Sequence, residues 1–266
     1  MDLVPTEGPE TAGRQAAGCA AAGSDLILAA GGDGTLNEIV QGLAGSDTCL
    51  GILPAGTANV LAVETRIGTD FLRAAREMKD FDDRRIALGR FQRSGDPPRY
   101  FAVMAGAGLD AQIVRRVSSP VKRRYGKLAY WLAGFGALGE TLREFEVDLN
   151  GETRRASFAL VSRVRNYGGD LEIARHASLL RDDFAVVLFS GASTFRYLKY
   201  FAGVLLDRLD GMSGVTVAHA QTLSLRPLNG TGFDLQIDGE YAGLAPVRLD
   251  IVPNGLRLLL PHRFKG

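Results

Sequence analysis

The chain has few of the residues that build disulfide frameworks or metal clusters. Among its 266 residues, cysteine occurs only twice, at Cys19 and Cys49, histidine three times and tryptophan once. Two cysteines are too few for a disulfide scaffold or a zinc cluster, and their scarcity is typical of a reducing compartment. The histidines, His176, His219 and His262, show no metal-ligand spacing. We therefore expect a cytoplasmic protein whose fold rests on its hydrophobic core.

A strong net charge and long apolar runs are also missing. Lysine and arginine number 31 against 30 aspartates and glutamates, so the net charge of +1 gives no global field that favours nucleic acid. The segment Met1–Gly13 is polar and acidic, unlike a signal peptide. Leu128–Leu138 is the longest apolar candidate, and it is too short and too interrupted by glycine to span a bilayer. We expect neither a nucleic-acid partner nor a membrane span.

Helix and strand patterns alternate in the first third of the chain. Short continuous apolar runs at Asp25–Ala30 and Cys49–Leu53 are typical of buried parallel strands. Helical patterns lie around these runs, at Glu10–Ala22, Thr35–Ala44 and Phe71–Lys79. Thr35 and Glu38 have the spacing of a capping box at the start of the second helix. This order predicts a parallel sheet with helices on its faces.

The pattern changes near Arg84, after which strand signals dominate. Runs with the composition of strands are Ile86–Phe91, Arg99–Met104, Glu146–Leu149, Ala156–Ser162, Phe184–Phe189, Thr222–Arg226, Asp234–Ile237 and Arg248–Ile251. Turn dipeptides lie between such runs, at Asn150–Gly151, Asn229–Gly230, Asp238–Gly239 and Asn254–Gly255. Arg116–Leu142 and Thr194–Leu209 have helical patterns. We predict an α/β domain over residues 1–84 and a mainly antiparallel β domain over residues 85–266.

Two glycine-rich turns follow the apolar runs of the first domain. Gly31–Thr35 reads Gly-Gly-Asp-Gly-Thr, Gly56–Asn59 reads Gly-Thr-Ala-Asn, and each precedes a helical pattern. Glycines let the backbone approach a ligand closely, and the N–H groups at a helix start favour phosphate. Asp33 would repel a phosphate, so we expect it to meet Mg²⁺ or a hydroxyl group. Either turn alone fits a tight strand-to-helix connection equally well.

Several longer segments resemble the diacylglycerol kinase and sphingosine kinase family of lipid kinases. The similar segments are Gly31–Glu38, Gly56–Ala62, Gly106–Ala111, Tyr125–Tyr130 and Ile237–Glu240. Together they extend the resemblance over nearly the whole chain. The Gly-Gly-Asp-Gly-Thr motif alone is shared with NAD kinases and phosphofructokinases. The late Asp-Gly-Glu in a β-rich second domain favours the lipid kinases.

The resemblance implies a fold and an activity. It implies an N-terminal α/β nucleotide-binding domain with a parallel sheet, a C-terminal β-sandwich domain, and a cleft between them where the γ-phosphate of ATP passes to a lipid hydroxyl with Mg²⁺. The residues that would hold the nucleotide by motif are Thr6, Gly31, Gly32, Asp33, Gly34, Thr35, Leu36, Asn37 and Thr57. Glu240, with Asp238, would be the base at the acceptor hydroxyl, and Asp33 would complete the catalytic set. From the residues alone, Asp238 and Glu240 also fit a hairpin turn with two solvated acids.

Two features depart from the family pattern. The family normally begins with a strand and an Asn-Pro-x-x-Gly turn that touches nucleotide, and nothing ahead of Asp2 supplies them. We therefore expect the first domain to lack its first strand. The family also often has an Asp-Gly pair at a structural Mg²⁺ site, where this chain has Leu180–Phe184 without a glycine. Asp182 is the candidate metal ligand there.

We expect a lipid kinase that uses ATP and Mg²⁺ and acts on diacylglycerol. A sphingoid base or another lipid as acceptor, NAD kinase activity, and a non-catalytic lipid- or nucleotide-binding role remain alternatives. Lys122–Arg124 followed by Leu128–Leu138 fits a membrane-surface element or a buried helix with a solvated basic end. The expected partners are ATP and a membrane lipid, with peripheral contact at the inner face of the membrane and a homodimer.

Overall fold

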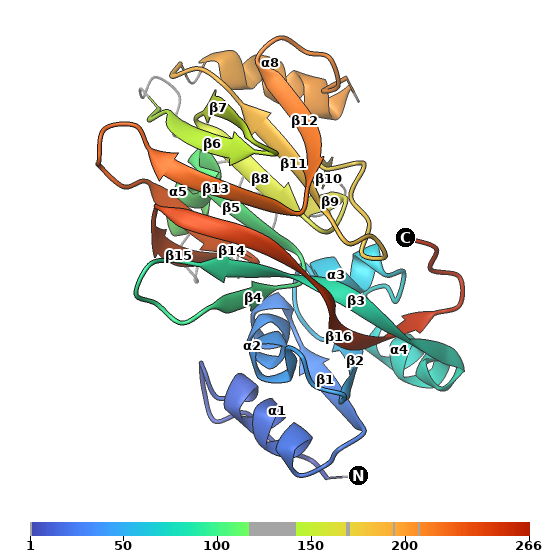
Figure 1. Ribbon diagram of the computed structural model, residues 1–266. Helices are drawn as coiled ribbons and strands as arrows, with labels where there is room; N and C mark the ends of the chain where they lie inside the picture. The colour runs from blue at the N-terminus through green and yellow to red at the C-terminus, as the bar shows by residue number, and fades with distance from the viewer. Residues whose placement is uncertain (1, 117–141, 169–170, 194, 207) are drawn as a thin grey trace.

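The computed structural model describes residues 2–116, 142–168, 171–193, 195–206 and 208–266, which form an α/β domain joined to a β sandwich (Figure 1). The predicted fold class is confirmed. In the first domain, β1 (Leu26–Gly31) and β2 (Cys49–Pro54) pair in parallel. The helices of this domain are α1 (Ala12–Ala21), α2 (Asp33–Leu43), α3 (Val60–Glu64) and α4 (Phe71–Glu77), followed by the 3₁₀ turn η1 (Met78–Asp80).

Helix α2 carries the first glycine turn and is held by its apolar side. Leu36, Val40 and Leu43 are buried in the core, as the helical spacing of apolar residues predicts. The predicted capping box is wrong, because the N-cap is Gly32, which has no side chain to cap with. Glu38 instead accepts hydrogen bonds from the N–H groups of Glu10 (2.8 Å) and Ala12 (3.0 Å). Its carboxylate therefore serves the start of α1, whose first N–H groups have no partner within the helix.

The strands form one mixed and one antiparallel sheet. The mixed sheet has the order β1, β2, β16 (Val247–Pro261), β13 (Thr222–Pro227), β6 (Phe145–Leu149) and β7 (Glu152–Ala156), while β3 (Phe81–Gln92) pairs with β16 and with β4 (Arg99–Phe101). The antiparallel sheet has the order β12 (Val215–Ala220), β11 (Phe184–Phe189), β8 (Phe158–Ser162), β5 (Met104–Gly108), β14 (Asp234–Ile237) and β15 (Glu240–Leu244). A small pair, β9 (Asn166–Gly168) and β10 (Leu171–Glu172), lies apart from both.

The antiparallel sheet is buried on both faces. Along β11, Phe184 and Val186 belong to the apolar core shared with the mixed sheet, whereas Ala185 and Val187 belong to the core on the opposite face. Helix α8 (Phe195–Leu205) contributes to that second face (Figure 1). This explains why the strand is a continuous apolar run, since alternation is lost when neither face meets water.

Strand β16 joins the two domains. Its first half pairs with β13 and β3 in the sandwich, and Arg257 and Leu258 in its second half pair in parallel with β2. The predicted turn at Asn254–Gly255 is wrong, because these residues form a bulge inside one continuous strand, with Asn254 at φ 54°. The predicted domain boundary at residue 84 falls inside β3, the partner of β16, and remains a prediction.

The helix predicted at Arg116–Leu142, with its basic and apolar segments, lies almost entirely outside the described residues, which resume at Leu142. Helix α5 (Leu109–Arg116) precedes this region and packs against β14 and β5. Within the described residues, no helix is long and apolar enough to cross a membrane.

Candidate active site between the domains

The two glycine turns touch each other at the ends of β1 and β2. A Cβ added to Gly56 would lie 2.4 Å from the Cα of Gly32, closer than any side chain tolerates. Asn59 shapes the second turn from a left-handed conformation (φ 49°), since its Oδ1 accepts the N–H of Gly56 at 2.9 Å and its Nδ2 donates to the Gly56 carbonyl. Glycine is thus required here for close backbone contact, and the carboxyl ends of the parallel strands form one surface.

Asp33 connects the two turns. Its Oδ1 accepts the N–H of Val60, the first residue of α3, at 2.7 Å. Burial raises the pKa of the Asp33 carboxyl above its ordinary value, and hydrogen bonds from backbone N–H groups, that of Val60 first, act against this rise. Asp33 therefore caps α3 with one oxygen, and this contact fixes α2 against α3.

The start of α2 offers N–H groups to an anion. The first helical N–H groups, including those of Gly34 and Thr35, have no acceptor within the helix. The predicted role of Leu36 in holding the nucleotide finds no support. Its side chain is buried in the core, and its N–H donates to the carbonyl of Gly32 at 3.0 Å. Thr57 is exposed in the neighbouring turn. We call the helix start and the neighbouring turn together the cradle, and N–H groups in this arrangement suit phosphate groups.

Asp238 lies in the hairpin turn between β14 and β15 and is held by four N–H donors. The predicted strand Arg99–Met104 is interrupted, and the N–H groups of Ala102 (3.3 Å), Val103 (3.1 Å) and Met104 (2.8 Å) point at the Asp238 carboxylate. The fourth donor is Asn37 Nδ2, at 3.0 Å. Burial raises the pKa of Asp238 to about 6, although these four hydrogen bonds favour its charged form. Asp238 therefore anchors the turn to both domains.

Glu240 lies across the domain boundary from the first glycine turn. A Cβ added to Gly34 would lie 3.2 Å from Glu240 Oε1, so this carboxylate is directly beside the start of α2. Glu240 is exposed, at the first position of β15. The structure thus brings the Gly-Gly-Asp-Gly-Thr turn and the Asp-Gly-Glu turn together, as the sequence predicts for a shared site.

Two further polar contacts fix the domains relative to each other at this site. Gln41 of α2 accepts the N–H of Tyr100 at 2.8 Å and donates to the Tyr100 carbonyl at 2.6 Å. Glu64 of α3 is 2% exposed and accepts from both Nε (3.0 Å) and the backbone N–H (3.1 Å) of Arg165. Helices α2 and α3, which carry the two glycine turns, are therefore hydrogen-bonded to the second domain.

Sequence reasoning missed these residues and also Asp110 and Gln236, which are buried behind the Asp-Gly-Glu turn. Gln236 could have been found as the polar residue between two apolar ones in the predicted strand Asp234–Ile237. Asp110 lies inside the segment Gly106–Ala111, whose resemblance to the family did not reveal its contacts.

Two predicted site residues are not among the contacts described above. Thr6 is in the exposed segment before α1. In the same segment, the carbonyl of Pro5 accepts a hydrogen bond from Gln15 Nε2 at 2.9 Å. Asp182 is exposed, and its carbonyl accepts from Gln221 Nε2 at 3.1 Å. Among the described residues, no three histidine, cysteine or acidic side chains are grouped so that they could hold a metal ion. Metal binding at Asp182 therefore stays a prediction.

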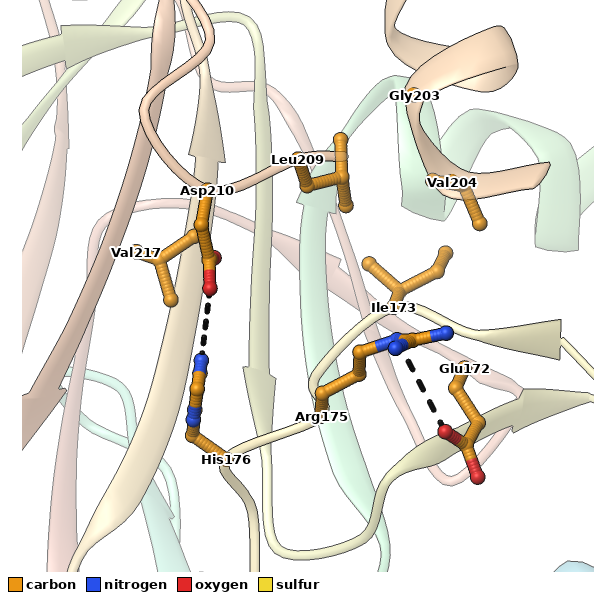
Figure 2. A pocket seen from close by; sticks show the side chains of 9 residues that line it. All are labelled: Glu172, Ile173, Arg175, His176, Gly203, Val204, Leu209, Asp210 and Val217. Atoms are coloured by element: carbon orange, nitrogen blue, oxygen red, sulfur yellow. Dashed lines mark hydrogen bonds and ion pairs between the residues drawn. The ribbon is translucent and has the colours of Figure 1, made fainter. Parts of the chain in front are cut away.

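A hollow in the second domain is separate from this cluster (Figure 2). Its lining residues are Glu172, Ile173, Arg175, His176, Gly203, Val204, Leu209, Asp210 and Val217. Its cavity volume is about 30 Å³. A hydrogen bond of 2.9 Å between His176 and Asp210 lies in its wall. A space this small and charged suits water rather than an acyl chain.

A glycine-lined helix start facing an acidic turn across a domain boundary fits a phosphoryl-transfer enzyme, because this chemistry needs positioning and charge stabilisation above all. Comparison with known families agrees. The diacylglycerol kinase catalytic domain matches residues 1–91, and the YegS C-terminal NAD kinase beta sandwich-like domain matches residues 103–260. The chain belongs to the diacylglycerol kinase catalytic-domain family and is a lipid kinase, an activity that implies the use of ATP.

Individual relatives support this assignment. The chain is 31% identical to a diacylglycerol kinase of Bacillus subtilis over 229 residues, which cover 84% of this chain and 73% of that protein. It is 29% identical to a diacylglycerol kinase of Mycobacterium tuberculosis over 252 residues, covering 92% and 80%. A crystal structure of a diacylglycerol kinase from Bacillus anthracis has the same fold, with a TM-score of 0.77 at 18% identity, covering 97% of this chain and 84% of that one.

Proposed function

We propose that this lipid kinase transfers the γ-phosphate of ATP, with Mg²⁺, to the hydroxyl of diacylglycerol and releases phosphatidic acid. The observation that carries the proposal is the position of Glu240, whose carboxylate lies beside the start of α2 at Gly34. The relatives named above are diacylglycerol kinases, and this supports diacylglycerol as the acceptor.

The residues of the cradle fit ATP and Mg²⁺. Contact between Gly32 and Gly56 leaves no room for side chains, so phosphate oxygens could approach the N–H groups of Gly34 and Thr35. Asp33 has a second carboxylate oxygen beyond the one that caps α3, and Mg²⁺ is usually held by one or two carboxylates plus substrate phosphates. When bound, Mg²⁺ would neutralise charge on the phosphates.

The acidic turn supplies the proton acceptor. Glu240 would take the proton of the acceptor hydroxyl as the new phosphate ester forms, since its carboxylate lies beside Gly34 and is exposed enough to meet a substrate. Asp238 already receives four hydrogen bonds, so we assign it the role of holding the turn. Thr57 and the helix start would bind phosphate groups.

The test is ATP consumption by the purified chain with Mg²⁺ in mixed micelles that contain diacylglycerol, sphingosine, monoacylglycerol or NAD. Phosphorylation of diacylglycerol at the highest kcat/KM is expected. A higher kcat/KM for sphingosine or monoacylglycerol would assign that lipid as the acceptor in place of diacylglycerol. Phosphorylation of NAD would show that the chain is an NAD kinase and not a lipid kinase. Silence with all four, from a folded chain, would indicate a non-catalytic relative.

We also propose that the enzyme works in the cytoplasm as a homodimer at the inner face of the membrane, where its lipid substrate lies. Cosedimentation with anionic and zwitterionic vesicles tests the membrane contact. Light scattering tests the dimer, and a monomeric mass at working concentration would reject it.

A further inference from the structure

A buried pair of polar side chains lies directly behind the turn that carries Glu240. Gln236 of β14 is 1% exposed and Asp110 of α5 is 0% exposed. Gln236 Nε2 donates to Asp110 Oδ2 at 2.8 Å, and Oε1 of the same side chain accepts the N–H of Gly239 at 2.9 Å. One side-chain amide therefore joins a buried acid to the backbone of the Asp-Gly-Glu turn.

The acid is itself oriented by a second donor. The hydroxyl of Tyr167, in β9, donates to Asp110 Oδ1. Tyr167 directly follows Asn166, whose N–H donates to Glu64 of α3 at 3.4 Å. With both carboxylate oxygens engaged, Asp110 fixes which end of the Gln236 amide is the donor, and so directs the carbonyl oxygen at Gly239.

The fold makes room for this pair. Gly106 of β5 lies opposite Gln236 in the sheet. A Cβ at Gly106 would lie 1.5 Å from Asp110 Oδ2 and 2.6 Å from Gln236 Nε2. The polar pair therefore exists only because position 106 carries no side chain.

The arrangement costs stability. Burial raises the pKa of Asp110 to about 6, against the lowering by its hydrogen bonds from Tyr167 and Gln236. The neighbours Leu235 and Ile237 are apolar and buried, and apolar residues at both position 110 and position 236 would avoid this cost. Buried polar groups that cost stability next to a reaction site are candidates for a role in the reaction.

We propose that Gln236 is a positioning residue for Glu240. Oriented by Asp110, the amide of Gln236 holds the N–H of Gly239, while Asp238 is held by the backbone of residues 102–104. The turn is thus fixed at Asp238 and at Gly239. Glu240 is the next residue, so its side chain is placed beside the start of α2. The inference rests on the proposed function, in which Glu240 is the base.

A double-mutant cycle tests the inference, with kcat and the KM for ATP measured on diacylglycerol micelles. Gln236→Met keeps the length of the side chain and removes both hydrogen bonds. It should lower kcat on the order of 10-fold to 100-fold, the scale of a misplaced catalytic group, and should leave the KM for ATP within about two-fold, because the cradle is not touched. Gln221→Met, which removes a hydrogen bond from an exposed turn, is the control and should keep the wild-type rate.

The decisive comparison is made in the Glu240→Gln background. If Gln236 acts through Glu240, Gln236→Met should lower kcat no further there, because the group that it positions has already lost its function. An equal loss in both backgrounds, or a rise in the KM for ATP as large as the fall in kcat, would overturn the inference.

Failure of the proposed function would be seen separately. A full rate for Glu240→Gln would remove the base assignment, and this inference with it. A slow Glu240→Gln beside a full-rate Gln236→Met would overturn the inference alone. If Gln236→Met does not fold, judged by near-UV circular dichroism, the same cycle is run with Tyr167→Phe, which removes a single hydroxyl. A smaller loss of kcat, absent in the Glu240→Gln background, is then expected.

Discussion

Asn37 Nδ2 donates to Asp238 Oδ2 at 3.0 Å, across 201 residues of sequence. Asn37 lies two residues after the first glycine turn, and Asp238 begins the acidic turn. The bond therefore connects the two motifs that define the site. It also supplies one of the four donors of the half-buried Asp238 carboxylate, whose charge would be destabilising there without partners.

Asn37→Asp should be costly because it places a second carboxylate against Asp238. At neutral pH we expect a loss of about 3 kcal/mol in the free energy of unfolding, the scale for an uncompensated buried charge. The loss should shrink at pH 5, where two facing carboxylates can share a proton. Urea unfolding at both pH values measures this. Asn229→Asp, in an exposed turn, is the control, and an equal effect there would contradict the explanation.

Asp33→Asn should show separately what the charge of Asp33 and its hydrogen bond to Val60 contribute. The new amide oxygen can still accept the N–H of Val60, so the melting temperature should stay close to that of the wild type. Turnover should fall by about 10²-fold or more, because the charge that would meet Mg²⁺ is lost. Asp70 also caps a helix, through Arg73 N–H at 2.9 Å, but takes part in none of the site contacts described above, and Asp70→Asn should keep full activity. A full-rate Asp33→Asn would remove Asp33 from the catalytic set.

Gly56→Ala should damage both stability and nucleotide binding. Its Cβ would lie 2.4 Å from the Cα of Gly32, so the two turns must move apart, at a cost of about 1–3 kcal/mol. The KM for ATP should rise because the cradle widens. In Gly18→Ala the new Cβ meets nothing within 4 Å, and this helix substitution should stabilise the protein by about 0.5–1 kcal/mol. Thermal unfolding and ATP titration of both variants decide the point.

Asp110 should make stability depend on pH. Its pKa rises from 3.8 to about 6 on burial, so the folded state binds a proton more tightly than the unfolded state does. The free energy of unfolding should therefore fall as pH rises from about 4 to about 6 and level off above this window. A shift of this size corresponds to about 3 kcal/mol.

Asp110→Asn should remove the part of the pH dependence of the unfolding free energy that Asp110 causes, because the amide has no proton to lose. Asp25→Asn changes an exposed acid and should keep the wild-type slope. Urea unfolding between pH 4 and pH 7.5 measures both variants. If Asp110→Asn leaves the pH dependence of stability unchanged, other groups cause it, and Asp238, whose pKa is also raised, is the first to examine.

Much of the fold follows from local patterns. The strands Phe184–Phe189 and Asp234–Ile237 were predicted at their observed bounds, because continuous apolar runs between turn residues leave few alternatives. The two glycine turns were predicted as well, since an apolar strand pattern that ends in glycine before a helical pattern fits few other structures. Asn254–Gly255 was predicted wrongly, because an Asn-Gly pair serves a bulge as well as a turn.

The partners of the site residues could not be predicted. The N–H groups that hold Asp238 come from residues 102–104, and the interruption between β4 and β5 that frees them leaves no mark in the local pattern. Glu38 was assigned to its own helix, whereas packing of α1 against α2 gives it the N–H groups of Glu10 and Ala12. Which donor an acid meets depends on how whole elements pack.

The sequence by itself determined the elements and the motif chemistry of this protein, because backbone preferences and apolar periodicity act over a few residues. Only the tertiary structure decided that Glu240 lies beside Gly34, that Asp33 caps α3, and that Gln236 joins Asp110 to Gly239. These contacts join segments far apart in the chain. Their geometry is fixed by the packing of the two sheets and by β16, which runs through both domains.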